Sequence, residues 1–124
     1  MQDMHPQAVR AHYSFFYGSL KSMIELISSK LDEITAACKQ HQVEALSLFG
    51  SAAQDAMHPG SDIDLLVAFS GDIDVLDYAD NYFSLLEQLQ RILNKKVDLV
   101  SNRSLKNTIL KEEIYRTKVD LYAA

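Results

Sequence analysis

Two acidic residues two positions apart, Asp62 and Asp64, stand at the start of an apolar run that extends from Ile63 to Phe69. Residues two apart in a strand point to the same face, so this spacing predicts two carboxylates aimed at one point. Such a pair repels itself unless a cation lies between its members. Mg²⁺ takes one or two carboxylates together with phosphate oxygens and water. The pattern therefore predicts a magnesium site that handles a phosphorylated substrate.

A third carboxylate, Asp98, interrupts the apolar run from Lys96 to Val100. A carboxylate within such a strand is costly unless it has a partner. One interpretation is an ion pair with Lys95, Lys96 or Arg103. The other places Asp98 on a strand beside the first pair, where it would complete a two-metal site and accept a proton from an attacking hydroxyl.

A glycine and a serine, Gly50 and Ser51, follow the apolar run from Val43 to Phe49. Glycine has no Cβ, so a phosphate can come close to the backbone there. A helix is predicted to begin at this point, over 51–57, and a helix N-terminus offers free N–H donors to a phosphate. Gly50 and Ser51 are therefore the candidate nucleotide-binding residues. His58, between this helix and Pro59-Gly60, is expected to be a solvated loop residue.

The remaining pattern predicts one α/β (α+β) domain with a small mixed sheet flanked by helices. Helices are expected over 19–41, with Ser19 as N-cap, over 75–93, and over 104–116, with Ser104 as N-cap. Strands are expected over 43–49, 63–69, 96–100 and 119–122. Helical spacing in the segment 75–93 predicts this inward-facing set: Leu76, Ala79, Phe83, Leu86, Leu89 and Leu93.

Two other short motifs serve as controls for the candidate site. A second Gly-Ser, Gly18-Ser19, does not follow a strand, and a second Asp-x-Asp, Asp72 and Asp74, precedes a helix. Acidic residues at that place normally cap the helix, so we assign Asp72 and Asp74 a structural role. The single cysteine, Cys38, is expected to be a buried apolar residue.

The chain of 124 residues has a formal net charge of -5 and a pI of about 5.2. This balance argues against binding to duplex nucleic acid and favours a basic partner. We expect a cytoplasmic protein with no signal peptide and no membrane span. The first 18 residues are expected to be a tail of uncertain order, rich in aromatic residues. This tail either packs over the domain or contacts a partner or second copy, and a homodimer or hetero-oligomer stays open.

Three segments together carry a resemblance to a known family: Leu48-Phe49-Gly50-Ser51, Ser61 to Val67, and Lys96 to Val100. They resemble the nucleotidyltransferase superfamily that shares the DNA polymerase β catalytic fold, and most of all its minimal nucleotidyltransferases, the MNT proteins. The resemblance covers roughly residues 20 to 122. It implies a single polymerase β-like nucleotidyltransferase domain, here residues 19–124.

The resemblance also implies the chemistry. Asp62, Asp64 and Asp98 would hold two Mg²⁺ ions, and Gly50 and Ser51 would hold the triphosphate of ATP. MNT proteins are commonly paired with a HEPN-domain RNase toxin and act as its antitoxin, by adding AMP to a tyrosine of that toxin. Larger relatives add a helical domain that forms the acceptor pocket, so a partner is expected to complete the site here.

One departure from the family pattern leaves alternatives open. Members often carry arginines just after the Gly-Ser, whereas this chain has Ala52 and Gln54. An arginine would bind the triphosphate in a bidentate manner. Its loss favours a non-catalytic antitoxin or regulatory subunit, while the three retained aspartates favour an enzyme. A metal-bound nucleotide sensor is a third hypothesis.

Overall fold

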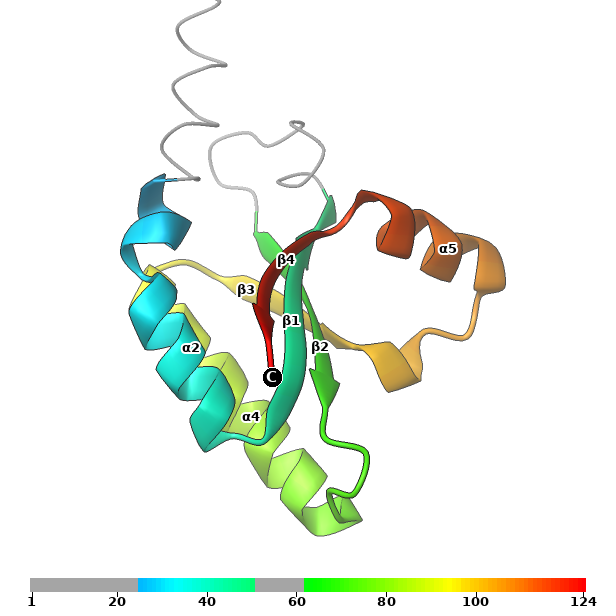
Figure 1. The fold of residues 1–124 in the computed structure, drawn as a ribbon, viewed down its shortest axis with the longest axis horizontal. Coiled ribbons are helices and arrows are strands. Elements are labelled where there is room, and N and C mark those ends of the chain that lie inside the picture. Colours follow the sequence, from blue (N-terminus) through cyan, green and yellow to red (C-terminus); the bar gives the residue numbers. More distant parts are fainter. Residues whose placement is uncertain (1–24, 51–61) are drawn as a thin grey trace, which may run out of the picture.

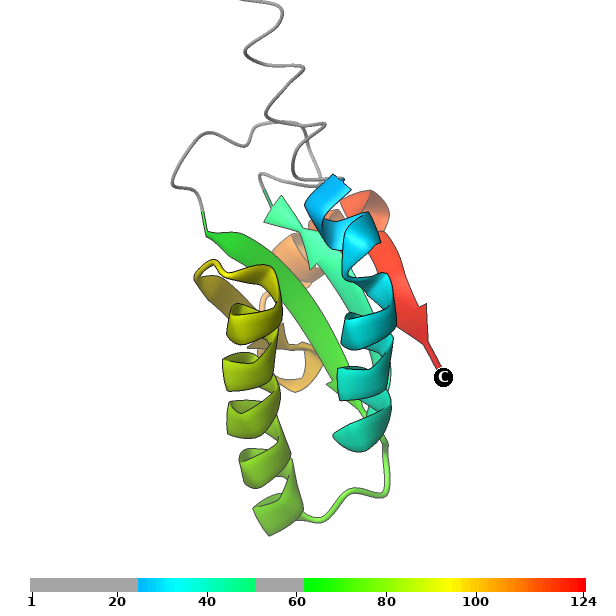
Figure 2. The ribbon, with the colours of Figure 1, turned by 90° about the vertical axis from the view of Figure 1, so that its left-hand side faces the viewer.

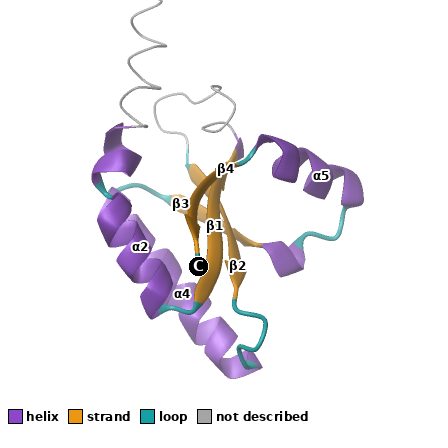
Figure 3. Ribbon diagram, viewed as in Figure 1, coloured by secondary structure: helices purple, strands orange, loops and turns teal. Residues whose placement is uncertain are grey.

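The chain folds around a four-stranded mixed sheet in the order β3-β2-β1-β4, shown in Figures 1 and 3. A computed structural model describes residues 25–50 and 62–124. The strands are β1 (Val43–Phe49), β2 (Ile63–Phe69), β3 (Val97–Ser101) and β4 (Val119–Ala123). The inner strand β1 is antiparallel to β2 and to β4, whereas β3 lies parallel to β2. This arrangement confirms the predicted α/β class with a small mixed sheet.

The helices are divided unequally between the two faces of the sheet. Helices α2 (Leu31–Gln40) and α4 (Val75–Leu93) cover one face side by side, and α5 (Thr108–Thr117) lies against the other (Figures 1 and 2). Residues 25–29 are also helical, and a turn at Lys30 separates them from α2. We call the first face the covered face and the second the open face. No helix within 25–50 and 62–124 is long and apolar enough to cross a membrane.

The hydrophobic core lies between the covered face and its two helices. Strand β2 shows how the pleat divides the strand, since Ile63, Leu65 and Val67 are buried while Asp64 is only half-buried. Cys38 of α2 is fully buried, as predicted, and burial raises the pKa of its thiol to about 12. The core includes these side chains: Ile34, Ala37, Leu46, Leu48, Phe69, Leu85, Leu89, Leu93 and Leu99.

Helix α4 has the predicted bounds, but part of the predicted inward face was wrong. Leu89 and Leu93 are buried, whereas Leu76 and Phe83 are 77% and 65% exposed and Ala79 is exposed as well. The inward face passes instead through Tyr78 and Tyr82. Their hydroxyls donate hydrogen bonds to Ser101 and to the Leu99 carbonyl of β3. Hydropathy ranks leucine and phenylalanine above tyrosine, so the predicted inward face of α4 included residues that the structure exposes to solvent.

The caps of α4 and α5 test the predicted helix starts. The Asp74 carboxylate accepts a hydrogen bond from the Leu76 N–H, which confirms the capping role assigned to Asp74. Helix α5, by contrast, begins at Thr108 behind an Asn107 cap, so the predicted start at Ser104 was wrong. Ser104 closes a short 3₁₀ helix, η1 (Asn102–Ser104), and its hydroxyl donates to the Ser101 carbonyl. Two residues with capping side chains competed, and the later one caps the α-helix.

Several predictions fall outside 25–50 and 62–124. These are the tail over residues 1–18, the cap at Ser19 and the helix over 51–57. Strand β3 begins and ends one residue later than predicted, and β4 extends one residue further. Such shifts of one residue leave the face assignments unchanged, because the residues that alternate in burial are the same.

Candidate nucleotidyl-transfer site

The parallel pairing of β2 and β3 places two of the predicted carboxylates side by side. Asp64 is the direct partner of Asp98 in the register, between the buried pairs Ile63–Val97 and Leu65–Leu99. Neighbouring strands lie about 4.8 Å apart, and paired residues in register point to the same face. Asp64 and Asp98 therefore both lie on the open face, although 34 positions separate them in the sequence.

The neighbouring carboxylates change the electrostatic environment of Asp64. Burial raises the pKa of Asp64, and the negative charges of Asp98 and Asp62 raise it further. Asp62 itself is exposed, just before β2 begins. The three carboxylates thus form a like-charge group whose repulsion a bound cation would relieve.

The glycine at the end of β1 is required by its contact with this group. Gly50 has φ of 71°, a left-handed conformation that side chains with a Cβ rarely adopt. A Cβ built on Gly50 would lie 2.2 Å from Oδ2 of Asp64. Phe49, the preceding residue, is the register partner of Asp64 across the β1–β2 pair. Only glycine therefore allows the backbone at the end of β1 to pass this close to the carboxylate.

The ion-pair interpretation of Asp98 can be checked against its three proposed partners. Lys95, Lys96 and Arg103 are all described, and none of them forms an ion pair with Asp98. Arg103 instead donates to the Ser70 carbonyl, and its guanidinium lies 4.8 Å from the centre of the Tyr78 ring. Asp98 thus keeps its carboxylate available on the open face.

The remaining predicted site residues are distributed as follows. Ser51, together with Ala52, Gln54 and His58, lies outside the described residues. Within 25–50 and 62–124, no three His, Cys, Asp or Glu side chains lie close enough together to hold a metal ion as they stand. The adjacent carboxylates of Asp64 and Asp98 are nevertheless the donor type that Mg²⁺ takes, with phosphate and water oxygens completing its shell. The residues present fit Mg²⁺ brought in with a triphosphate.

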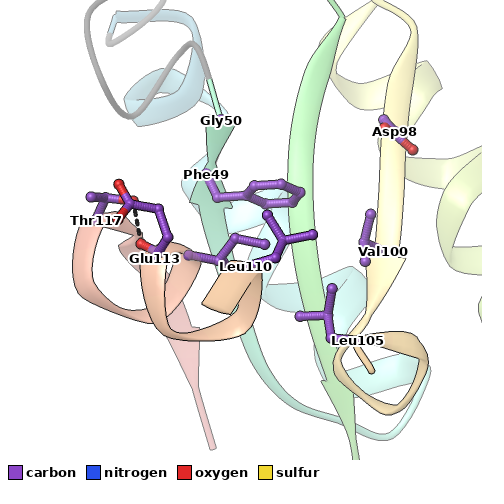
Figure 4. A pocket seen from close by; sticks show the side chains of 9 residues that line it. Phe49, Gly50, Asp98, Val100, Leu105, Leu110, Glu113 and Thr117 are labelled. Carbon is purple, nitrogen blue, oxygen red and sulfur yellow. Dashed lines mark hydrogen bonds between the residues drawn. The ribbon is translucent and has the colours of Figure 1, made fainter. Parts of the chain in front are cut away.

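A hollow of about 290 Å³ lies between the open face and α5, next to the carboxylates. Figure 4 shows Phe49, Leu110 and Leu105 among its walls, with Asp98 on the strand at its edge. Thr117 at its far side donates a hydrogen bond to the Glu113 carbonyl. The full lining is Phe49, Gly50, Asp98, Val100, Leu105, Leu110, Glu113, Ile114 and Thr117. Sequence reasoning missed this hollow because its residues come from four separate segments.

A mixed sheet that pairs two carboxylates beside a strand-ending glycine is the architecture of a nucleotidyl-transfer protein. Comparison with protein families supports this class, because residues 32–124 match the family model described as Polymerase beta, Nucleotidyltransferase. The match spans most of the chain, and the chain belongs to this family. It is accordingly a nucleotidyltransferase.

Individual relatives agree with the family assignment. The chain is 36% identical over 75 residues to a protein named "Putative protein adenylyltransferase MJ1379" of Methanocaldococcus jannaschii, covering 60% of this chain and 73% of the relative. It is 31% identical over 88 residues to "Putative protein adenylyltransferase MJ1215" of the same organism, covering 71% and 98%.

Solved structures show the same fold. A structure described as a putative minimal nucleotidyltransferase is similar with a TM-score of 0.60 and 30% identity, over 77% of this chain and 92% of that one. A toxin–antitoxin crystal structure with AMP-PNP has a TM-score of 0.58 and 26% identity, over 76% and 73%. The resemblance to minimal nucleotidyltransferases is confirmed by these neighbours.

Proposed function

We propose that this nucleotidyltransferase moves AMP from ATP to a tyrosine hydroxyl of a protein partner. Asp62, Asp64 and Asp98 are the catalytic and metal-binding residues in this proposal, and Gly50 and Ser51 bind the nucleotide. The observation that carries it is the register pairing of Asp64 with Asp98, against a glycine that approaches the Asp64 carboxylate closely. A purely structural role gives no reason to place two carboxylates side by side.

The chemical step is an in-line displacement at the α-phosphorus. Asp98 accepts the proton of the acceptor hydroxyl, whose oxygen forms a bond to the α-phosphorus as the bond to the bridging oxygen of the β-phosphate breaks. The products are a phosphodiester-linked AMP on the acceptor and free pyrophosphate. Two Mg²⁺ ions held by the three aspartates, when bound, supply charge neutralisation for the triphosphate and the leaving pyrophosphate. Gly50 leaves the phosphates room beside the backbone.

The hollow beside Asp98 favours an aromatic acceptor. Its walls are mainly apolar, with Phe49, Leu110 and Ile114 among them, and Asp98 lies at its edge. A tyrosine ring would bury its apolar faces against these walls while its hydroxyl points toward the carboxylate. A serine or threonine would leave most of the hollow unfilled.

The resemblance and the comparisons support the choice of nucleotide and partner. The relatives in Methanocaldococcus jannaschii carry the name "Putative protein adenylyltransferase", and one neighbouring toxin–antitoxin structure contains AMP-PNP. We therefore take ATP as the substrate and a HEPN-domain toxin as the acceptor, with this cytoplasmic chain as the antitoxin. The net charge of -5 favours a basic partner of this kind.

The test is incubation of the purified chain with α-labelled ATP, Mg²⁺ and the protein encoded by the neighbouring gene, taken in this proposal to be a HEPN-domain toxin, followed by mass analysis of both proteins. We expect an added AMP on a tyrosine of the partner. Asp64→Asn should abolish it. The matched control is Asp72→Asn, in the second Asp-x-Asp, where Asp72 accepts a bond from the Ser70 hydroxyl and lies away from the site. A product that persists in Asp64→Asn contradicts the assigned site.

A non-catalytic antitoxin is the second candidate, favoured by Ala52 and Gln54 in place of the family's arginines. Neutralisation of the partner in cells, rather than the transfer assay, distinguishes this candidate from the enzyme. If Asp64→Asn neutralises the partner as fully as the unmodified chain does, complex formation alone is sufficient and catalysis is unnecessary. Loss of neutralisation with retained binding supports the enzyme.

A further inference from the structure

The outward face of the first half of α4 is apolar although it faces solvent. Val75, Leu76 and Phe83 are 83%, 77% and 65% exposed, and Ala79 lies between them one turn from each neighbour. Positions 75, 76, 79 and 83 follow helical spacing, so these side chains form one continuous surface, which we call the α4 stripe. Exposed apolar residues that are contiguous in this way mark interaction surfaces more often than isolated ones do.

A groove of about 400 Å³ extends the α4 stripe toward the edge strand β3. Ala79 and Phe83 belong to both the stripe and the groove wall, and the rings of Tyr82 and Phe83 meet edge to face at 5.1 Å. The Tyr82 hydroxyl donates to the Leu99 carbonyl at the outer edge of β3. Because this polar atom is already satisfied, the groove offers apolar side chains rather than a free carbonyl for an added strand.

The groove also meets the proposed active site. Val100 of β3 lines both this groove and the hollow that holds Asp98 at its edge. The two cavities therefore adjoin on either side of one residue of the edge strand. A protein seated along α4 and β3 would have its surface next to the entrance of the hollow.

The border of the α4 stripe is acidic along the helix, while Arg103 of η1 lies beside Val75 and Tyr78 at the start of the stripe. Asp80 lies four residues after Leu76 and three before Phe83, and Glu87 lies four residues after Phe83, so both are surface neighbours of the stripe. With Asp77 they are the charged residues of segment 75–90, which contains neither Lys nor Arg. The closest basic residue along the helix, Arg91, pairs with Glu87 at 3.5 Å.

This charge pattern selects the kind of occupant. A second copy of the chain on the stripe would bring the carboxylates of one acidic border against those of the other, which is unfavourable. A surface with an apolar centre and a border of Lys or Arg would match both features.

We propose that the α4 stripe and its groove are the docking surface for a protein partner that presents an apolar patch bordered by basic residues. The inference rests on the proposed function in one respect, since the partner is taken to be the acceptor protein. The inference adds the place where that protein binds, which is along α4 and the edge strand β3, beside the hollow that receives its tyrosine. Docking there holds the acceptor hydroxyl near Asp98.

The test measures binding separately from catalysis. The Kd for the HEPN-domain protein proposed as acceptor is determined by calorimetry, with all variants in an Asp64→Asn background so that no transfer occurs. The variant Leu76→Ser combined with Phe83→Ser removes apolar surface at exposed positions, so its thermal midpoint should stay unchanged. We expect binding to weaken by about tenfold or more, as for residues at the centre of an interface.

Two further variants supply the matched controls. Ile109→Ser removes an equally exposed apolar side chain from α5, where Ile109 is 80% exposed, and should leave Kd within about twofold. Asp80→Asn should weaken binding and reduce its salt dependence between about 50 and 300 mM, because an exposed charge pair is screened by salt.

The outcomes separate this inference from the proposed function. Unchanged affinity in the Leu76→Ser, Phe83→Ser variant overturns the docking surface, even if the unmodified chain still transfers AMP. Weakened affinity in that variant alone supports the docking surface, even if no AMP transfer is found. Self-association of the unmodified chain through the stripe, lost in the double variant and without binding to the HEPN protein, also overturns it.

Discussion

The two faces of the sheet are built from the same strands but follow opposite rules. On the covered face, side chains such as Leu46, Leu65 and Leu99 are buried against α2 and α4. On the open face, the intervening positions carry the charged Asp64 and Asp98 next to apolar residues such as Leu66 and Val100. The pleat of each strand separates the residues that form the core from those that form the candidate site, because successive residues point to different faces. Substitutions on the two faces should therefore have separable effects.

The largest effect is expected from Asp64→Asn on the open face. Loss of the carboxylate should reduce the rate of AMP transfer by about 100-fold to 1000-fold, as for other groups that stabilise charge in the transition state. The free energy of unfolding should stay the same or rise slightly, because like-charge repulsion with Asp98 and Asp62 is removed. Transfer kinetics and urea unfolding measure the two quantities. A loss of stability as large as the loss of activity would contradict the separation of the faces.

The reverse result is expected from Leu89→Ala on the covered face. Leu89 is fully buried in the core, so truncation should lower the free energy of unfolding by about 2–5 kcal/mol. The fraction that stays folded should transfer AMP at close to the normal rate, since Leu89 lies on the far side of the sheet from the carboxylates. Urea unfolding and transfer per folded molecule, measured on one preparation, test this. A folded but inactive variant would show that the faces are coupled.

Gly50→Ala should affect both quantities to a moderate extent. The new Cβ enters a left-handed backbone conformation and meets the Asp64 carboxylate, so we expect a loss of about 1–2 kcal/mol of stability. AMP transfer should fall as well, because Asp64 must move. The matched control is Gly71→Ala, since a Cβ there meets nothing within 4 Å. Equal effects of the two substitutions would show that the Gly50–Asp64 contact is unimportant.

The smallest expected effects concern pH, and they have opposite signs for two carboxyls of the open face. The pKa of Asp120 is lowered by hydrogen bonds from Lys118 and Ser47. Its contribution to stability is present above its unfolded pKa of about 3.9 and is lost as pH falls through the lower folded pKa. The Asp120 side chain is 70% exposed, so this contribution should be below about 1 kcal/mol. Asp120→Asn should accordingly reduce the acid sensitivity of unfolding.

Asp64 supplies the contrast, because its pKa is raised. Between its unfolded pKa and its higher folded pKa, the folded state binds more protons, so stability falls as pH rises through that window. Asp64→Asn should remove this fall, measured as the free energy of unfolding at a series of pH values without metal. If both variants shift the pH profile in the same direction, the assigned environments are wrong.

The sequence patterns that predicted correctly were those set by local periodicity. The apolar runs from Val43 to Phe49 and from Ile63 to Phe69 predicted β1 and β2 at their observed bounds. That Asp62 shares a face with Asp64 stays a prediction. The neighbour of Asp64 was predicted to be Asp98 through family resemblance, and the parallel register confirms that the two lie side by side. The roles of Gly50, Ser51, Asp62, Asp64 and Asp98, the two Mg²⁺ ions and the division between 1–18 and 19–124 stay predictions.

Features that depend on contacts between distant segments were not predictable in the same way. The inward face of α4 is decided by tyrosine hydroxyls that find acceptors on β3, which hydropathy does not register. The hollow beside Asp98 depends on where α5 lies, and the predicted N-cap of that helix, Ser104, lies three residues before the observed cap, Asn107. The close approach of Gly50 to Asp64 requires the β1–β2 register.

The buried thiol of Cys38 can report how often the hydrophobic core opens. It is the single cysteine of the chain, fully buried and held protonated by its surroundings, so an alkylating reagent reacts with it only when the core opens. The rate at which Cys38 of the unmodified protein is alkylated therefore measures how often α2 separates from the sheet. If partner binding on α4 stabilises the folded state, the rate of Cys38 alkylation should fall. This measurement needs no dye or added label on the docking surface.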